Sequence, residues 1–193
     1  VIKDKTENVE KLTLRFVDDR LLTTPPVALM QVKKEIDYML GLVEENIGLS
    51  FVAMETGSLE YSECIAKNEE IIDFTNSALT KFLIKLTGSV EQSEEKIIGS
   101  YFHVLNDLER IGDHAENFHD IGVELADKKL SFSDEAREGI KAMRTNVAEM
   151  FNIAKDAFEN HNFARLPELT AFEDRVDAMK DDLTSQHYTR LAE

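Results

Sequence analysis

Apolar residues recur along most of the chain at intervals of three and four, which places them on one face of an α-helix. Five stretches have this spacing, and no stretch alternates with period two for long enough to predict a strand. The first three predicted helices cover 25–56, 59–86 and 90–127, the fourth ends before residue 161, and the fifth runs from 163 to the end. The pattern therefore predicts an all-α protein.

Residues that start and stop helices mark the breaks between these stretches. Thr24 precedes two prolines, an arrangement typical of a helix start with Thr24 as N-cap. Ser131 or Ser133 is expected to cap the fourth helix, and Pro167 marks the start of the fifth helix or lies in its first turn. The remaining predicted breaks lie at Gly57, Gly88–Ser89 and His161–Asn162.

Composition limits the classes of partner. The chain has 193 residues and a net charge of -16, so binding to nucleic acid or to an anionic membrane surface is not expected. No apolar run is long enough for direct membrane insertion. Cys64 is the single cysteine, and the sequence begins with Val1 rather than methionine, which indicates a processed chain or an excerpt from a longer one.

The segment Asp107–Asn117 carries the most informative chemistry. Glu109, Asp113 and Asn117 follow one another at steps of four, so their oxygen-bearing side chains form a ridge along one side of a helix. Two stacked anions repel each other, and a bound cation would offset that repulsion. Arg110 is a weaker alternative partner.

Two further helices carry the same Glu-x-x-x-Asp spacing, namely Glu69 with Asp73 and Glu173 with Asp177. The pairs lie 104 residues apart, and the same offset superimposes the first predicted helix on the fourth. The chain is thus predicted to hold two three-helix repeats, with the sixth helix absent.

Carboxylates from facing helices predict a site for a hard divalent or trivalent cation, such as Mg²⁺, Ca²⁺, Mn²⁺ or iron, and not for zinc. Glu69 falls in line with Ile65 and Ile72, so it is expected at the packed face, where a carboxylate needs a partner. The alternative is a solvated acidic face with ordinary ion pairs to Lys67 and Lys180.

Nothing in the sequence argues for catalysis. Glu116-x-x-His119 matches one half of a di-iron carboxylate signature, but no other histidine has a glutamate three positions earlier. No glycine-rich phosphate loop or nucleophile elbow is present. We therefore expect a protein that is not an enzyme. A di-iron carboxylate enzyme is the least favoured of three functional hypotheses, and the two others follow below.

The run Leu108-Glu-Arg-Ile-Gly-Asp-His-Ala-Glu-Asn117 closely resembles the signature of the PhoU family, and Asp19–Ala28 resembles the link into the PhoU-like tail of bacterial sodium/phosphate cotransporters. The resemblance implies a PhoU-like bundle. Residues 1–23 would be a linker from a membrane part, 24–130 the first three-helix repeat and 131–193 an incomplete second repeat. The resemblance to the PhoU family also implies a set of metal ligands, namely Glu69, Asp73, Glu109, Asp113, Glu173 and Asp177, with Asn117 as a possible neighbour.

The leading functional reading from this resemblance is a metal-binding regulatory domain of a sodium-dependent phosphate transporter. It would lie on the cytoplasmic side of the cell membrane and contact the membrane transport domain of the same polypeptide. The alternative is a free-standing PhoU-type adaptor that regulates phosphate uptake and signalling. Without a sixth helix, the apolar face of the fourth and fifth helices would be left open, which predicts a homodimer or looseness there.

Overall fold

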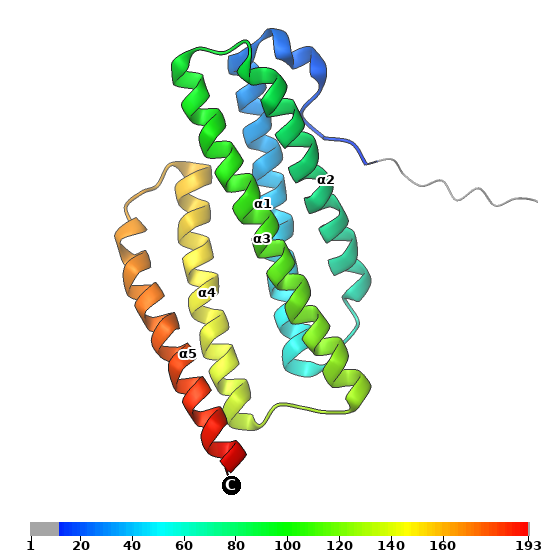
Figure 1. The fold of residues 1–193 in the computed structure, drawn as a ribbon, viewed down its shortest axis with the longest axis vertical. Coiled ribbons are helices and arrows are strands. Elements are labelled where there is room, and N and C mark those ends of the chain that lie inside the picture. The colour runs from blue at the N-terminus through cyan, green and yellow to red at the C-terminus, as the bar shows by residue number, and fades with distance from the viewer. Residues whose placement is uncertain (1–11, 193) are drawn as a thin grey trace, which may run out of the picture.

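The computed structural model of this protein describes residues 12–192 and the side chains of residues 12–189. The described residues form five α-helices and two short 3-10 helices, with no strand among them (Figure 1). The predicted all-α fold is confirmed. Residues 1–11 of the predicted linker lie outside the described residues. The elements are η1 (Asp19–Thr23), α1 (Pro25–Thr56), α2 (Ser62–Thr87), α3 (Gln92–Lys128), α4 (Asp134–Asn160), η2 (Leu166–Glu168) and α5 (Leu169–Ala192).

Most helix ends lie at or close to the predicted positions. Gly57 ends α1 with a φ of 67°, in the left-handed region that glycine adopts without strain. The Ser133 hydroxyl accepts a hydrogen bond from the amide of Ala136 and caps α4. Thr24 occupies the predicted cap position of α1, but its hydroxyl donates to the carbonyl of Leu21 instead of accepting from the helix.

The fifth helix begins later than predicted. The expected start was at residue 163, whereas α5 begins at Leu169 and the 3-10 turn η2 precedes it. Pro167 lies inside η2, lacks an amide donor and disfavours helical backbone at Leu166 before it. The helical spacing of apolar residues therefore starts before the regular helix does.

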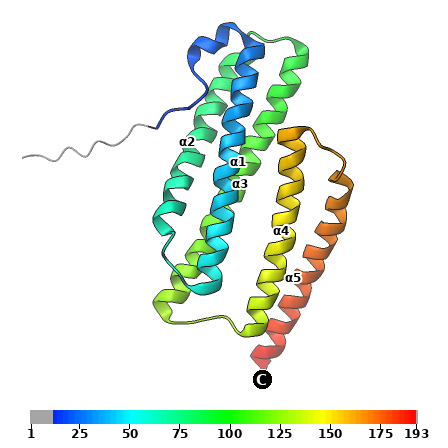
Figure 2. The same ribbon diagram turned by 180° about the vertical axis from the view of Figure 1, so that it is seen from behind.

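Helices α1, α2 and α3 form a three-helix bundle in which each helix contacts the other two (Figures 1 and 2). Their apolar stripes meet in one core, and its most deeply buried side chains include Ile36, Met39, Ile72, Leu83 and Leu105. Gly122 of α3 lies against the backbone of Ala53, because a Cβ at position 122 would be 2.6 Å from the Ala53 carbonyl. A glycine there lets α3 approach α1 closely.

The segment before α1 is held to the bundle by a buried carboxylate. Glu35 of α1 is 1% exposed and accepts hydrogen bonds from the backbone amides of Arg15 and Phe16, at 3.0 Å and 2.8 Å. These backbone donors satisfy a charged group that burial alone would penalise. The described part of the predicted linker is therefore packed against α1.

Helices α4 and α5 form a hairpin beside the bundle, with α4 against α1 and α5 on the outer side in both views (Figures 1 and 2). Lys155 and Arg144 of α4 form ion pairs with Glu44 and Glu55 of α1. The buried side chains of α4 in the described chain are Ile153 and Ala157. No α5 side chain among residues 169–189 is buried.

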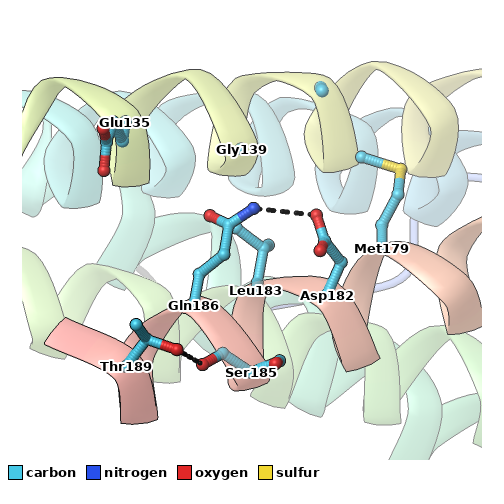
Figure 3. Close-up of a pocket in the computed structure, with 9 residues that line it drawn as sticks. Glu135, Gly139, Met179, Asp182, Leu183, Ser185, Gln186 and Thr189 are labelled. Atoms are coloured by element: carbon cyan, nitrogen blue, oxygen red, sulfur yellow. Dashed lines mark hydrogen bonds between the residues drawn. The ribbon is translucent and has the colours of Figure 1, made fainter. Parts of the chain in front are cut away.

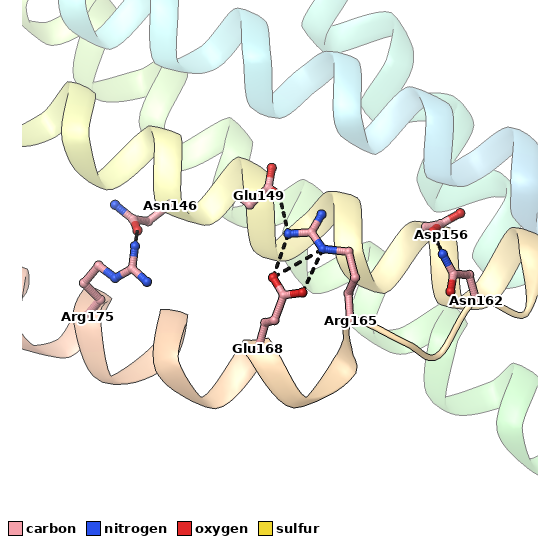
Figure 4. Close-up of polar contacts among 7 residues, drawn as sticks. All are labelled: Asn146, Glu149, Asp156, Asn162, Arg165, Glu168 and Arg175. Atoms are coloured by element: carbon pink, nitrogen blue, oxygen red, sulfur yellow. Dashed lines mark hydrogen bonds and ion pairs between the residues drawn. The ribbon is translucent and has the colours of Figure 1, made fainter.

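Polar contacts and a hollow lie along the α4–α5 hairpin. Arg165 forms ion pairs with Glu149 and Glu168, both at 2.8 Å, where the chain turns between the two helices (Figure 4). Near the other end, Gly139 and Leu183 line an open hollow of about 810 Å³ (Figure 3). The apolar face that was predicted to be open thus lies on two helices with few buried side chains. Homodimerisation through this face stays a prediction.

None of the helices in the described chain is both long enough and apolar enough to cross a bilayer.

Candidate functional site

The candidate site is built around Glu69, in the middle of α2. Ile65 and Ile72 lie four and three residues away on the same helical face and are buried in the bundle. Glu69 therefore enters the packed region with them and is 7% exposed, as its position in the apolar stripe predicted. Asn46 of α1 donates to its Oε2 at 3.4 Å, whereas Oε1 is buried without a hydrogen-bond partner.

Gly112 of α3 makes the room for this carboxylate. A Cβ at position 112 would lie 3.0 Å from Oε1 and 3.1 Å from Oε2 of Glu69. Any larger residue would press on the carboxylate group. Gly112 belongs to the acidic motif of α3 and directly precedes Asp113, so the motif supplies both the space for Glu69 and an acid next to it.

The surroundings of Glu69 oppose its ionisation. Burial raises the pKa of Glu69 to about 7, and the negative charges of Asp73, Glu116 and Asp113 act in the same direction. The hydrogen bond from Asn46 opposes this rise. Acids from α2 and α3 therefore lie close enough to affect one another, and a cation or a proton would relieve their repulsion.

The other predicted ligands of α3 lie on the same ridge. Glu109 is half-buried, while Asp113 and Asn117 are exposed, as is Asp73 on α2. Within residues 12–192, no group of three or more acidic, histidine or cysteine side chains converges tightly enough to enclose a metal ion as the chain stands. The residue types still suit a hard cation, and the unpartnered oxygen of Glu69 is the position that such an ion would satisfy.

Glu173 and Asp177 lie apart from these acids. Both are exposed on α5, which contacts α4 and η2 but neither α2 nor α3 in the described chain. Asp177 lies 3.8 Å from Lys180, the ion pair that the solvated-face alternative allows. The structure therefore brings Asp113 of α3 near the pair on α2 and leaves the pair on α5 on the outer hairpin.

A buried amide network beside Glu69 was missed in the sequence. Asn46 is fully buried on α1, and its side-chain oxygen accepts from Asn68 at 3.0 Å. Asn68 also donates to Glu45 at 3.0 Å. Asn46 follows Val43 at helical spacing, so it is a polar residue within an apolar stripe. That position is the signal in the sequence that could have indicated a buried hydrogen-bond partner.

His119, the histidine of the half di-iron signature, has a partner that sequence reasoning also missed. Its Nε2 lies 2.7 Å from the hydroxyl of Ser62, the first residue of α2. This contact joins the C-terminal part of α3 to the start of α2, 57 residues away in the sequence. Local spacing along the chain gave no signal for it.

Comparison with known proteins finds similarity in the segment that contains this site. Residues 36–121 match the PhoU domain, a segment that includes the acids of α2 and α3 but not those of α5. The chain is 24% identical over 167 residues, 86% of its length, to a phosphate-specific transport system accessory protein PhoU homolog of Aquifex aeolicus (strain VF5), and covers 74% of that protein. No solved structure matches the chain. These matches show that the chain is similar to the PhoU domain over residues 36–121 and to a PhoU homolog over most of its length.

Proposed function

We propose that this chain is a non-catalytic PhoU-type regulator of phosphate uptake that works on the cytoplasmic side of the cell membrane. The observation that carries the proposal is the PhoU domain match over 36–121, which coincides with the bundle that holds Glu69. The relative in Aquifex aeolicus is named as an accessory protein of phosphate-specific transport, and the chain covers 74% of it. That relationship favours the free-standing adaptor over the tail of a sodium/phosphate cotransporter.

A metal ion between α2 and α3 is the second part of the proposal. Glu69, Asp73, Glu109 and Asp113 would hold it, with Asn117 as a neighbour. Bound there, a hard cation such as Mg²⁺, Mn²⁺, Ca²⁺ or iron would supply positive charge to a carboxyl group whose pKa burial raises. The unpartnered Oε1 of Glu69 and the acids around it support this part. Glu173 and Asp177 would contribute only to a second, separate site.

Thermal unfolding with and without Mn²⁺ or Mg²⁺, and after chelation, tests the metal proposal. Binding to the folded state raises the melting midpoint with ion concentration. Asp113→Ala should abolish that rise, whereas Asp127→Ala, which removes an exposed aspartate from the end of the same helix, should leave it intact. An undiminished rise in Asp113→Ala would place the ion elsewhere.

Phosphate uptake in cells of the source organism tests the regulatory proposal. Deletion of the gene should change uptake under phosphate-replete conditions, and the wild-type gene should restore normal regulation. The sequence encoded upstream of Val1 separates the two transport readings, because membrane-spanning helices there would favour the cotransporter tail. Unaltered uptake in the deletion strain would refute a role in phosphate transport even if the metal measurements succeed.

A further inference from the structure

The acidic motif of α3 has a second face that the proposed metal site does not use. Arg110 and His114 lie four residues apart and line a groove between α3 and α4. In the described chain, the rings of Tyr101 on α3 and Phe158 on α4 touch edge to face, while the backbones of the two helices stay apart and both helices contact α1. The groove therefore has α3 and α4 as walls and α1 as its floor.

The groove is apolar inside and has the size of a small-molecule site. Leu40 and Leu108, both nearly fully buried, lie at its base, and the partly buried Ile111, Phe151 and Phe158 line its walls. Its volume is about 470 Å³. Sites for organic ligands have volumes of about 300–1,000 Å³, mostly apolar walls and a few polar groups that orient the ligand. The groove has each of these properties.

Basic residues line the groove in a chain of net charge -16. Arg110, His114 and Lys155 lie there, with Asp107 as the acid among the lining residues. Lys155 already forms an ion pair with Glu44. Arg110 is exposed, and no hydrogen bond or ion pair engages it within the described chain. A guanidinium is thus left to bind an anionic group beside an apolar surface.

We propose that this groove binds an amphipathic organic anion, with its apolar body against Phe151 and Phe158 and its carboxylate on Arg110. Arginine presents paired donors that match a carboxylate in a bidentate arrangement. A small inorganic anion would leave the apolar walls exposed to water, so the apolar lining favours a ligand with a hydrocarbon body. Medium-chain carboxylates such as decanoate have this chemistry.

Titration calorimetry with decanoate, below its micelle-forming concentration, tests the proposal on the whole chain. Decanoate should bind with one site per chain, and decyltrimethylammonium, which has the same tail and the opposite charge, should bind at least about tenfold more weakly. Equal binding of the two amphiphiles would overturn the proposal, as would no binding of decanoate.

Two variants locate the binding. Arg110→Gln should weaken decanoate binding at least about tenfold, while Arg137→Gln, an exposed arginine of α4 outside the groove, should not. Ala154→Trp adds a large ring at an exposed groove position and should block binding, with an unchanged melting midpoint showing that the chain still folds. If Arg110→Gln binds decanoate like the wild type, the groove is not the site. Suppose instead that only an acidic amphipathic peptide displaces decanoate, and that Ala154→Trp leaves the binding of decanoate itself unchanged. That result would overturn the proposal in favour of a protein partner.

Discussion

The carboxylate of Glu69 on α2 lies directly against Gly112 on α3, with its two oxygens 3.0 Å and 3.1 Å from the place where a side chain at 112 would begin. The two residues are far apart in sequence. The contact between them accounts both for the space that the buried Glu69 occupies and for the presence of glycine at position 112. Glu69 needs the space, and a glycine in the middle of a long helix is otherwise unfavourable compared with alanine. The close approach of α2 and α3 makes this glycine part of the site.

Gly112→Ala should therefore destabilise the protein by about 1–3 kcal/mol, because the new methyl group forces the Glu69 carboxylate out of its position. Gly99→Ala, in the same helix with nothing within 4 Å of the added Cβ, should instead stabilise it by about 0.5–1 kcal/mol. Urea unfolding followed by circular dichroism measures both. Equal behaviour of the two variants would show that the contact with Glu69 is unimportant.

Glu69 should also make stability depend on pH. The folded chain holds the Glu69 proton up to about pH 7, whereas the unfolded chain releases it near 4.5, so the folded state binds more protons between these values. The free energy of unfolding therefore falls as pH rises through this window, by at most about 3 kcal/mol, and no such penalty exists below pH 4.5.

Glu69→Gln should remove this contribution, so its stability relative to the wild type should increase from pH 4.5 to pH 8. Glu70→Gln alters the exposed neighbouring residue and serves as the control, with little pH-dependent difference expected. Urea unfolding of each variant across the range, with chelator present, gives the comparison. A parallel pH dependence in wild type and Glu69→Gln would contradict the prediction.

Glu35→Gln should loosen the segment before α1. Replacing one carboxylate oxygen with an NH₂ group opposes the donors of Arg15 and Phe16 and should cost about 2–3 kcal/mol. The amides of Arg15 and Phe16 should also exchange with deuterium faster, which a general loss of stability would not confine to this segment. Asp37→Asn, at a partly exposed ion pair with Lys33, should cost less than about 1 kcal/mol and leave those two amides unchanged.

Helix α5 should exchange its amide hydrogens faster than α1. It contacts α4 and η2, and none of its described side chains is buried, so few contacts oppose local opening. Native-state hydrogen exchange resolved by peptide compares the two helices directly. If protection in α5 rises with protein concentration, a second copy covers the hairpin, in agreement with the predicted homodimer. Protection equal to that of α1 at low concentration would show that α5 is more stable than its contacts suggest.

The periodicity of apolar residues was sufficient to locate most helices. Gly57 and Ser133 act where local backbone chemistry predicts, since a left-handed helix end and a serine cap depend on a few neighbouring residues. The burial of Glu69 was also predictable, because its register with Ile65 and Ile72 sets the direction of its side chain. The start of α5 was not, because Pro167 interrupts the backbone without interrupting the spacing.

The sequence by itself determined the all-α class, the PhoU-like motif and the acids on each helix, because all of these depend on residues within a few turns of one another. Only the tertiary structure decided that Asp113 of α3 lies near Glu69 while Asp177 lies on the outer hairpin. Spacing fixes the face of a helix on which a side chain lies, but not which other helix that face meets. That choice depends on how the apolar stripes pack together, and Gly112 shows that it can depend on the absence of a single side chain.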